Sequence, residues 1–270
     1  MAIVNRTPDS FYDHGETFGF ERALDAVRTA VDDGADIVDI GGVKAGPGAE
    51  VDVEEEIRRV VPLVAAVRER FPDLVISVDT WRNEVGRRAC AAGADLLNDT
   101  WQGADPTLAE VAAEFGAGYV CSHTGGVPPR TRPFRVHYPD VVRSVLDEVI
   151  TRAEQVVKLG VPREGVLIDP THDFGKNTWH GLELLRRADE LSATGWPVLM
   201  ALSNKDFVGE TLGAPLQDRV DGTLAATAIA AWQGAAVFRA HQVRQTRHVV
   251  EMVASIRATR PPSACFRGMA

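Results

Sequence analysis

Cysteine is scarce in this chain, with only Cys90, Cys121 and Cys265 among 270 residues. The three lie far apart and form no CxxC pair, which excludes a zinc knuckle and a redox dithiol motif. A sparse and odd number of thiols is typical of a reducing compartment, so we expect a cytoplasmic protein.

Long apolar runs are also missing. No stretch of about 18 consecutive apolar residues occurs, and the first five residues lead directly into polar ones. We therefore expect neither a membrane span nor a signal peptide, and no membrane partner.

Positive charge is in deficit, because 29 Lys and Arg stand against 38 Asp and Glu and give a net charge of −9. Sequence-independent binding of nucleic acid requires a dominant positive field, so we expect no nucleic-acid partner. An anionic small molecule can still bind where a few cations converge locally.

The rest of the composition, 45% hydrophobic and 25% charged, provides enough apolar residues for a large core and excludes disorder, collagen and coiled coil. At the usual ~150 residues per domain, 270 residues lie between one and two domains. An α/β barrel, however, reaches ~250 residues as a single unit.

Short β-branched runs alternate with stretches of helical period, such as the one that carries Val142, Val145 and Val149. The eight strand-like runs span residues 2–5, 36–41, 74–79, 95–99, 118–123, 166–169, 198–203 and 237–241. Eight strand and helix units predict a parallel sheet closed into a single (β/α)8 barrel domain over residues 1–270. A doubly wound sheet is the alternative, but Asn5-Arg6-Thr7-Pro8 follows the first strand instead of the glycine fingerprint.

Polar residues end every predicted strand, where the reacting groups of such barrels lie. A single Asp in this position also serves as a helix cap, but eight polar ends at one mouth predict a functional site. Asp79, Asn98 and Asp169 can read the edge of a flat heterocycle by hydrogen bonds. The cations at these ends are Lys205, Arg239 and His241. The predicted ligand is therefore a planar polar ring joined to an anionic group.

Several of these strand ends form longer motifs. The first strand and its loop read Ile3-Val4-Asn5-Arg6-Thr7-Pro8-Asp9-Ser10-Phe11. The later motifs are Asp39-Ile40-Gly41-Gly42, Ser77-Val78-Asp79-Thr80, Asn98-Asp99, Asp169-Pro170 with Phe174-Gly175-Lys176, Leu202-Ser203 with Lys205, and Phe238-Arg239-Ala240-His241. This ordered series, along essentially the whole chain, resembles the dihydropteroate synthase family of pterin-binding barrels.

The resemblance implies a reaction in which the amine of p-aminobenzoate displaces pyrophosphate from 6-hydroxymethyl-7,8-dihydropterin pyrophosphate. Carried over by position, the residues that hold the pterin are Asp79, Asn98, Asp169, Lys205 and Arg239. Asp79, Asp169 and Lys205 are the catalytic residues among them. The residues for the pyrophosphate are Asn5, Arg239 and His241, with Mg²⁺ at Asn5 to offset the charge of the leaving group. The resemblance also implies a homodimer.

The second loop departs from the family pattern. Active members continue Gly-Gly with Glu-Ser-Thr-Arg-Pro-Gly, whereas this chain reads Gly42-Val43-Lys44-Ala45-Gly46-Pro47-Gly48. Ala45 and Gly46, before Pro47, thus replace the hydroxyl and guanidinium that close over the pyrophosphate and the aminobenzoate. Lys44 or Arg6 could supply the missing cation, although Arg6 could equally be a solvated loop residue.

The predicted aminobenzoate side departs as well. The loop before Phe174 reads Thr171-His172-Asp173 where the family has glycines, which adds bulk and charge. Asp206 stands where a small hydroxyl would help to bind the aminobenzoate carboxylate, and two like charges ~4 Å apart cost ~4 kcal/mol at an effective dielectric constant of ~20. Alternatively, Asp206 caps a helix that begins at Phe207 and points away from the pocket.

We therefore expect a member of the divergent second-copy branch of the family, with a retained pterin pocket and weak or no dihydropteroate synthase activity. The alternatives are an active synthase, a transferase with a different amine acceptor, and a non-catalytic pterin or folate sensor. A corrinoid methyltransferase is disfavoured, because Lys205 and the 169–176 loop follow the synthase pattern.

Overall fold

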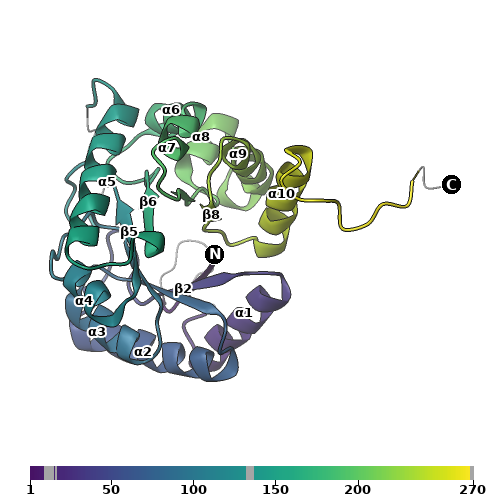
Figure 1. Ribbon diagram of the computed structural model, residues 1–270. Helices are drawn as coiled ribbons and strands as arrows, with labels where there is room; N and C mark the ends of the chain where they lie inside the picture. The colour runs from purple at the N-terminus through teal and green to yellow at the C-terminus, as the bar shows by residue number, and fades with distance from the viewer. Residues whose placement is uncertain (9–14, 16, 132–136, 268–270) are drawn as a thin grey trace.

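Parallel strands form the centre of the computed structural model, and helices surround them (Figure 1). The structure describes residues 1–8, 15, 17–131 and 137–267. The strands are β1 (Ala2–Asn5), β2 (Ile37–Gly41), β3 (Val75–Asp79), β4 (Leu96–Asp99), β5 (Gly118–Ser122), β6 (Val166–Asp169), β7 (Leu199–Met200) and β8 (Val237–Phe238). Each begins within one residue of its predicted start, so the period-based prediction is confirmed.

The outer layer follows the helical periods of the sequence. The helices are α1 (Phe20–Asp32), α2 (Val53–Arg70), α3 (Asn83–Ala91), α4 (Leu108–Phe115), α5 (Val141–Lys158), α6 (Thr178–Arg186), α7 (Ala188–Ser192), α8 (Asp206–Leu212), α9 (Val220–Trp232) and α10 (Val243–Ile256), with short 3₁₀ turns η1 (Arg163–Gly165) and η2 (Leu216–Asp218). Asp52 and Asp140 cap α2 and α5 by accepting the backbone N–H three residues on. The predicted apolar face of α5, including Val142, Val145 and Val149, is fully buried.

The strands close into a ring. β1 to β6 form one parallel sheet in chain order, and β7 pairs with β8. Isolated parallel bridges join Ile168 to Val198 and Ala2 to Ala240, which connects β6 with the β7 side and β8 with β1. The predicted (β/α)8 barrel is thereby confirmed.

β7 and β8 are shorter than predicted, ending at Met200 and Phe238 rather than at residues 203 and 241. Side chains replace the ladder there, because the His241 N–H donates to Ser203 Oγ at 3.2 Å. Gln242 then accepts from the Ser203 hydroxyl and the Asn204 amide, each at 3.2 Å. The two strands thus continue as loops with hydrogen bonds between side chains and backbone.

The barrel interior is apolar in its middle and polar at the carboxyl ends of the strands. Leu96, Val120, Leu199 and Ala201 form a small buried cluster inside the ring. Two residues further along β4, Asn98 points to the same face as Leu96, because side chains alternate along a strand. Polar side chains at the carboxyl ends therefore rest on a packed floor.

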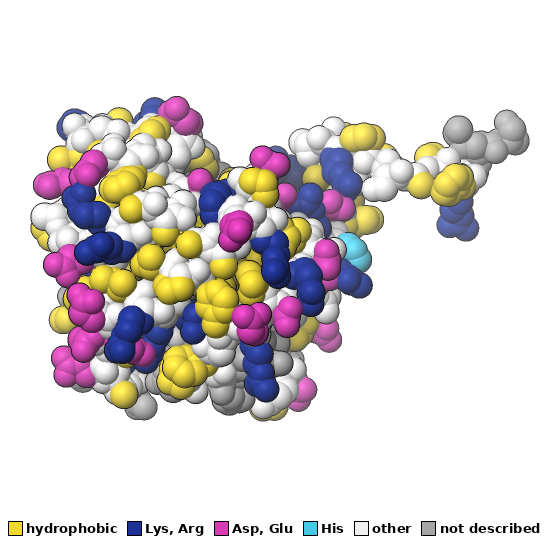
Figure 2. Space-filling model, turned by 90° about the horizontal axis from the view of Figure 1, so that it is seen from below, with side chains coloured by type: hydrophobic (Ala, Val, Ile, Leu, Met, Phe, Trp, Pro, Cys, Tyr) yellow, Lys and Arg dark blue, Asp and Glu magenta, His cyan; other side chains and the backbone are white. Residues whose placement is uncertain are grey.

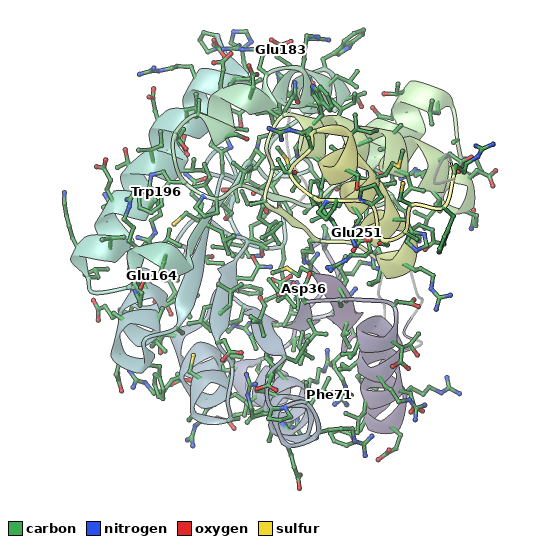
Figure 3. All side chains as sticks on the ribbon, turned by 45° about the vertical axis from the view of Figure 1, so that its right-hand side comes forward. Asp36, Phe71, Glu164, Glu183, Trp196 and Glu251 are labelled. Carbon is green, nitrogen blue, oxygen red and sulfur yellow. The ribbon has the colours of Figure 1, made fainter. Side chains whose placement is uncertain are left out.

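Ion pairs connect the last helix to the first unit of the barrel. Arg247 of α10 contacts Asp36, just before β2, at 2.7 Å and Glu251 at 2.8 Å; Figure 3 labels both acidic residues. After α10 the chain leads away from the barrel (Figure 1). Within the described part of the chain, no helix is both long and apolar enough to cross a bilayer.

Charges of both signs are interspersed on the face seen in Figure 2, with hydrophobic side chains between them. On this face the acidic side chains therefore do not gather into a single acidic field.

A buried ion pair connects the loops that follow β2 and β3. Glu56 of α2 is 0% exposed and accepts from the Thr80 hydroxyl and the Arg82 guanidinium, both at 2.7 Å. Arg82 also donates to the carbonyl of Val51 at 2.7 Å. Burial raises the pKa of Glu56, so its ionised form depends on the arginine.

We expect Arg82→Ala to lower the free energy of unfolding by about 3 kcal/mol, because the Glu56 carboxylate loses its cation in a buried place. Urea unfolding followed by circular dichroism measures the change. Arg58→Ala is the control, since Arg58 is 72% exposed and pairs with Glu55 at the surface. The control should lose less than about 0.5 kcal/mol, and equal losses would contradict the structural role of the buried pair.

Candidate functional site

Asp39 of β2 lies at the centre of the polar cluster inside the barrel. Its side chain is 0% exposed and accepts from Ser77 Oγ at 2.6 Å, Asn98 Nδ2 at 3.1 Å and Arg239 Nε at 2.5 Å. These donors come from β3, β4 and the segment after β8. One carboxylate thus orients side chains from three other parts of the barrel.

Arg239 bridges two carboxylates. Besides Asp39 it contacts Asp79, at the end of β3, with Nη2 at 3.1 Å. Thr100 donates to the other oxygen of Asp79 at 3.2 Å. Burial raises the pKa of Asp79 to about 7, opposed by the charge of Arg239 and reinforced by that of Asp39. Asp79 can therefore exchange a proton near neutral pH.

Asn98 offers a hydrogen-bond acceptor to the site. Its side chain is 1% exposed, and its Nδ2 is held by Asp39. Its Oδ1 is buried and finds no partner among the described residues. An unpaired buried acceptor costs free energy, so its retention is expected where a ligand supplies the donor.

The loop after β6 starts from Asp169, which is 2% exposed. Its carboxylate accepts from the Thr171 N–H at 2.7 Å, and burial raises its pKa. Thr171 has a φ of 51°, in the left-handed region that disfavours a β-branched residue. The Thr171 hydroxyl compensates by donating to the Asp169 carbonyl at 3.1 Å and accepting from the His123 N–H at 3.3 Å.

Lys176 fixes the shape of the same loop. Its ammonium donates to the carbonyls of His123 at 2.9 Å and of Thr171 and Phe174 at 3.0 Å each. Burial lowers the pKa of Lys176 to about 7. By binding the carbonyls of Thr171 and Phe174, Lys176 fixes the backbone on both sides of Asp173.

Lys205 lies beside this loop rather than free in the mouth. Its ammonium contacts Asp173 Oδ2 at 3.1 Å and lies 5.7 Å from the centre of the Phe174 ring. Phe174 packs edge-on against Trp101 at 4.6 Å, and Trp101 against Trp81 at 6.4 Å. Lys205 thus stands next to an aromatic wall with its charge paired.

Asp206 does not face the pocket, which corrects the expectation of charge repulsion at this position. The side chain is 81% exposed and contacts Arg219 at 2.9 Å. The reason is local: α8 begins at Asp206 itself, so its carboxylate lies on the outer surface of the first turn. The added charge near the pocket comes instead from Asp173.

Arg6 has a structural role in the protein. Its guanidinium is largely buried and donates to the carbonyls of Phe18 and Arg59, each at 3.0 Å. It also lies over the Phe20 ring at 5.7 Å. Arg6 is therefore already engaged where the sequence suggested a mobile substitute cation.

The second loop leaves its altered positions open. Ala45 and Pro47 are exposed and Gly46 is partly exposed. A Cβ added to Gly46 would meet only Lys44 Cε, at 3.9 Å. The loop thus has room for the missing side chains and does not replace them.

Of the three residues predicted for pyrophosphate, Asn5 and His241 lie at neighbouring strand ends, and Arg239 bridges Asp39 and Asp79. Asn5 ends β1, where a Cβ on Gly41 would come within 3.4 Å of its Oδ1, so glycine keeps this space clear. His241 lines a groove together with Thr17 and Arg22. The motif residues Asp9, Ser10 and Phe11 lie outside the described residues.

Sequence reasoning missed the role of Asp39, although a carboxylate inside the apolar run Ile37-Val38-Asp39-Ile40 was a usable signal.

Two histidines near the site differ in their contacts. His123 points toward α5, with Nε2 3.3 Å from Ser144 Oγ. His172 is 2% exposed, and neither ring nitrogen finds a partner in the described part of the chain. Nothing in the sequence distinguished these histidines from ligand contacts.

Known proteins resemble this chain over nearly its whole length. The family model described as pterin binding enzyme matches residues 1–241. A Mycobacterium leprae protein named inactive dihydropteroate synthase 2 is 64% identical over 274 residues, covering 100% of this chain and 94% of that protein. The dihydropteroate synthase of Haemophilus influenzae is 38% identical over 253 residues, covering 93% and 91%.

A solved structure extends the agreement to the fold. The Yersinia pestis dihydropteroate synthase in complex with a sulfonamide drug superposes with a TM-score of 0.90 at 36% identity, covering 96% of this chain and 94% of that one. The shared fold and the match over nearly the whole length leave one conclusion. This chain belongs to the pterin-binding enzyme family and is a homologue of dihydropteroate synthase.

Proposed function

We propose that this protein binds a pterin pyrophosphate in the barrel mouth and catalyses its condensation with p-aminobenzoate weakly or not at all. The observation that carries the proposal is the buried, unpaired Oδ1 of Asn98, oriented by Asp39. A pterin ring has N–H donors along its edge, and an acceptor fixed in this way can receive one without first losing another partner.

The other groups of the cluster suit the same ring. The carboxylates of Asp79 and Asp169 accept N–H groups, and Asp79 can do so in its ionised form. Arg239 is held edge-on by Asp39 and Asp79, which leaves the flat face of the guanidinium for stacking on the pterin.

Binding of Mg²⁺ is part of the proposal, because the amide oxygen of Asn5 suits this ion. Among the described residues no three His, Cys, Asp or Glu side chains gather into a metal cluster, and Asn5 contributes one amide oxygen. This set suits an ion that takes its other ligands from pyrophosphate and water, as Mg²⁺ does at phosphate sites. When bound, the ion would offset charge on the leaving pyrophosphate.

Two features support weak condensation. The second loop carries Ala45 and Gly46 where active relatives place a hydroxyl and a guanidinium, and the Arg6 guanidinium is already held by two backbone carbonyls. Lys205 is paired with Asp173, so its charge is partly neutralised. The 64% identical relative from Mycobacterium leprae is named inactive, which agrees with weak condensation.

A homodimer and a cytoplasmic location remain predictions. α9 and α10 expose Ile229, Trp232, Met252 and Ile256, each at least 53% exposed, and such a group of apolar side chains suits a subunit contact. Val253 of α10 is instead buried in the hydrophobic core.

Isothermal titration calorimetry tests pterin binding directly. We expect saturable binding of 6-hydroxymethyl-7,8-dihydropterin pyrophosphate that tightens with Mg²⁺, and no heat from Mg²⁺ alone. Asn98→Ala should weaken binding about tenfold, because the ligand loses a buried hydrogen bond. The control Asp206→Asn changes an exposed side chain and should bind normally. Absence of binding to the unaltered protein would overturn the proposal.

The proton of Asp79 makes binding depend on pH. In the free protein the pKa of Asp79 is about 7, so at pH 6 the carboxyl is largely protonated, and ring N–H donors bind its ionised form. We expect release of up to about one proton per pterin bound at pH 6 and almost none at pH 8.5. Calorimetry in two buffers of different ionisation enthalpy measures it.

Asp79→Asn should abolish this proton release. The same raised pKa means that the native state keeps a proton lost by the unfolded chain, so the contribution of Asp79 to stability falls as the pH rises from about 4 to about 7. Equal proton release by the variant would contradict the assignment.

A coupled assay for pyrophosphate release measures condensation. With both substrates we expect turnover more than about tenfold below that of an ordinary synthase, and Gly46→Arg should raise it about tenfold by adding one charge-assisted hydrogen bond to the pyrophosphate. Ala49→Arg places the same charge elsewhere in the exposed loop and serves as the control. Turnover of the unaltered chain within tenfold of an ordinary synthase would refute the weak-activity proposal.

A further inference from the structure

The β6 loop places a carboxylate on the solvent side of Lys205. Lys205 acts on two acidic groups: its charge opposes the rise that burial causes in the pKa of Asp169, and its Nζ contacts Asp173 at 3.1 Å. Asp169 is 2% exposed, whereas the Asp173 side chain is 36% exposed. Asp173 is therefore the more exposed of the two carboxylates that interact with Lys205.

The backbone around Asp173 is fixed. Lys176 donates to the carbonyls of Thr171 and Phe174, which lie on either side of Asp173, and to that of His123 in the neighbouring strand end. Thr171 adds two hydrogen bonds through its hydroxyl. The loop thus holds the carboxylate in front of Lys205 by several independent contacts.

Aromatic side chains line the space next to this carboxylate. Phe174 follows Asp173 in the chain, lies 5.7 Å from the Lys205 ammonium and packs against Trp101 at 4.6 Å. Flat apolar surfaces beside a single carboxylate suit an aryl ring that carries no negative charge.

We propose that Asp173 sets the charge of the acceptor, so that the second half of the site takes a neutral or cationic arylamine in preference to one that carries a carboxylate. The proposal rests on the proposed pterin function. Asp173 weakens the binding of an anionic acceptor in two ways, since it neutralises Lys205 and repels an anion directly. Asp206, the other acidic departure from the family pattern, is excluded from this role because it faces solvent and Arg219.

The chemistry of transfer is unchanged by the acceptor's charge. The uncharged amine nitrogen forms a bond to the pterin methylene carbon, the carbon–oxygen bond to pyrophosphate breaks, pyrophosphate leaves with the electron pair, and the amine loses a proton to solvent. Asp173 therefore acts on binding of the group opposite the amine and is a specificity residue.

Three compounds of nearly the same shape test the proposal. p-Aminobenzoate, p-aminobenzamide and p-aminobenzamidine carry charges of about −1, 0 and +1 opposite the same amine at pH 7.5. Each is titrated by calorimetry into the protein saturated with 6-hydroxymethylpterin, which lacks the leaving group and cannot react. We expect the amidine to bind at least about tenfold tighter than the benzoate, with the amide between them.

Asp173→Asn keeps the side-chain size and should shrink this ratio to about threefold or less, whereas the matched charge change Asp206→Asn should leave it unaltered. In the unaltered protein, salt should also compress the ratio, which tests the charge without any variant. Benzoate binding as tight as that of the amidine, or equal effects of the two variants, would overturn the inference. Failure of 6-hydroxymethylpterin itself to bind would instead overturn the proposed function, and the inference with it.

Discussion

The buried ion pair between Asp39 and Arg239 is the interaction on which the site depends. It connects β2 with the end of β8, which belong to separately hydrogen-bonded parts of the ring. Because Asp39 is fully buried, its charge is tolerable only with its three donors in place, and those donors include Asn98 and Arg239 themselves. The same contact that makes the carboxylate stable therefore orients the residues offered to a ligand.

The site divides into an inner part carried by strands and an outer part carried by loops. Asp39, Asp79, Asn98 and Asp169 are strand residues, and their positions follow from the parallel register of the sheet. Three departures from the active pattern, Ala45, Gly46 and Asp173, are in loops, and a fourth, Asp206, begins the surface helix α8. A barrel permits this division, because loop residues can change without disturbing the packed floor beneath. Loss of the outer chemistry and retention of the inner cluster are thus physically independent events.

Much of the fold could be predicted from the sequence, because alternating strand and helix periods are local signals and every strand began within one residue of the predicted start. The strand-end residues could also be placed at one mouth, since parallel strands share a direction. Side-chain direction could not be predicted. Asp206 faces solvent because α8 begins at that residue, and Arg6 is engaged by carbonyls 12 and 53 residues away. The pairing of Asp173 with Lys205 depends on a loop whose shape is fixed by Lys176, which no spacing in the sequence reveals.

Because the strands differ in length, the two halves of the barrel mouth differ in rigidity. β7 and β8 have two ladder residues each and meet their neighbours through isolated bridges, whereas β1 to β6 form a continuous sheet. Most of the carboxylates stand on the continuous sheet, and Lys205 and Arg239 stand after the two short strands. With fewer backbone hydrogen bonds to break, the cationic half is the more deformable one. A ligand of unusual shape or charge would therefore be accommodated by movement of Lys205, whereas Arg239 stays fixed by Asp39 and Asp79.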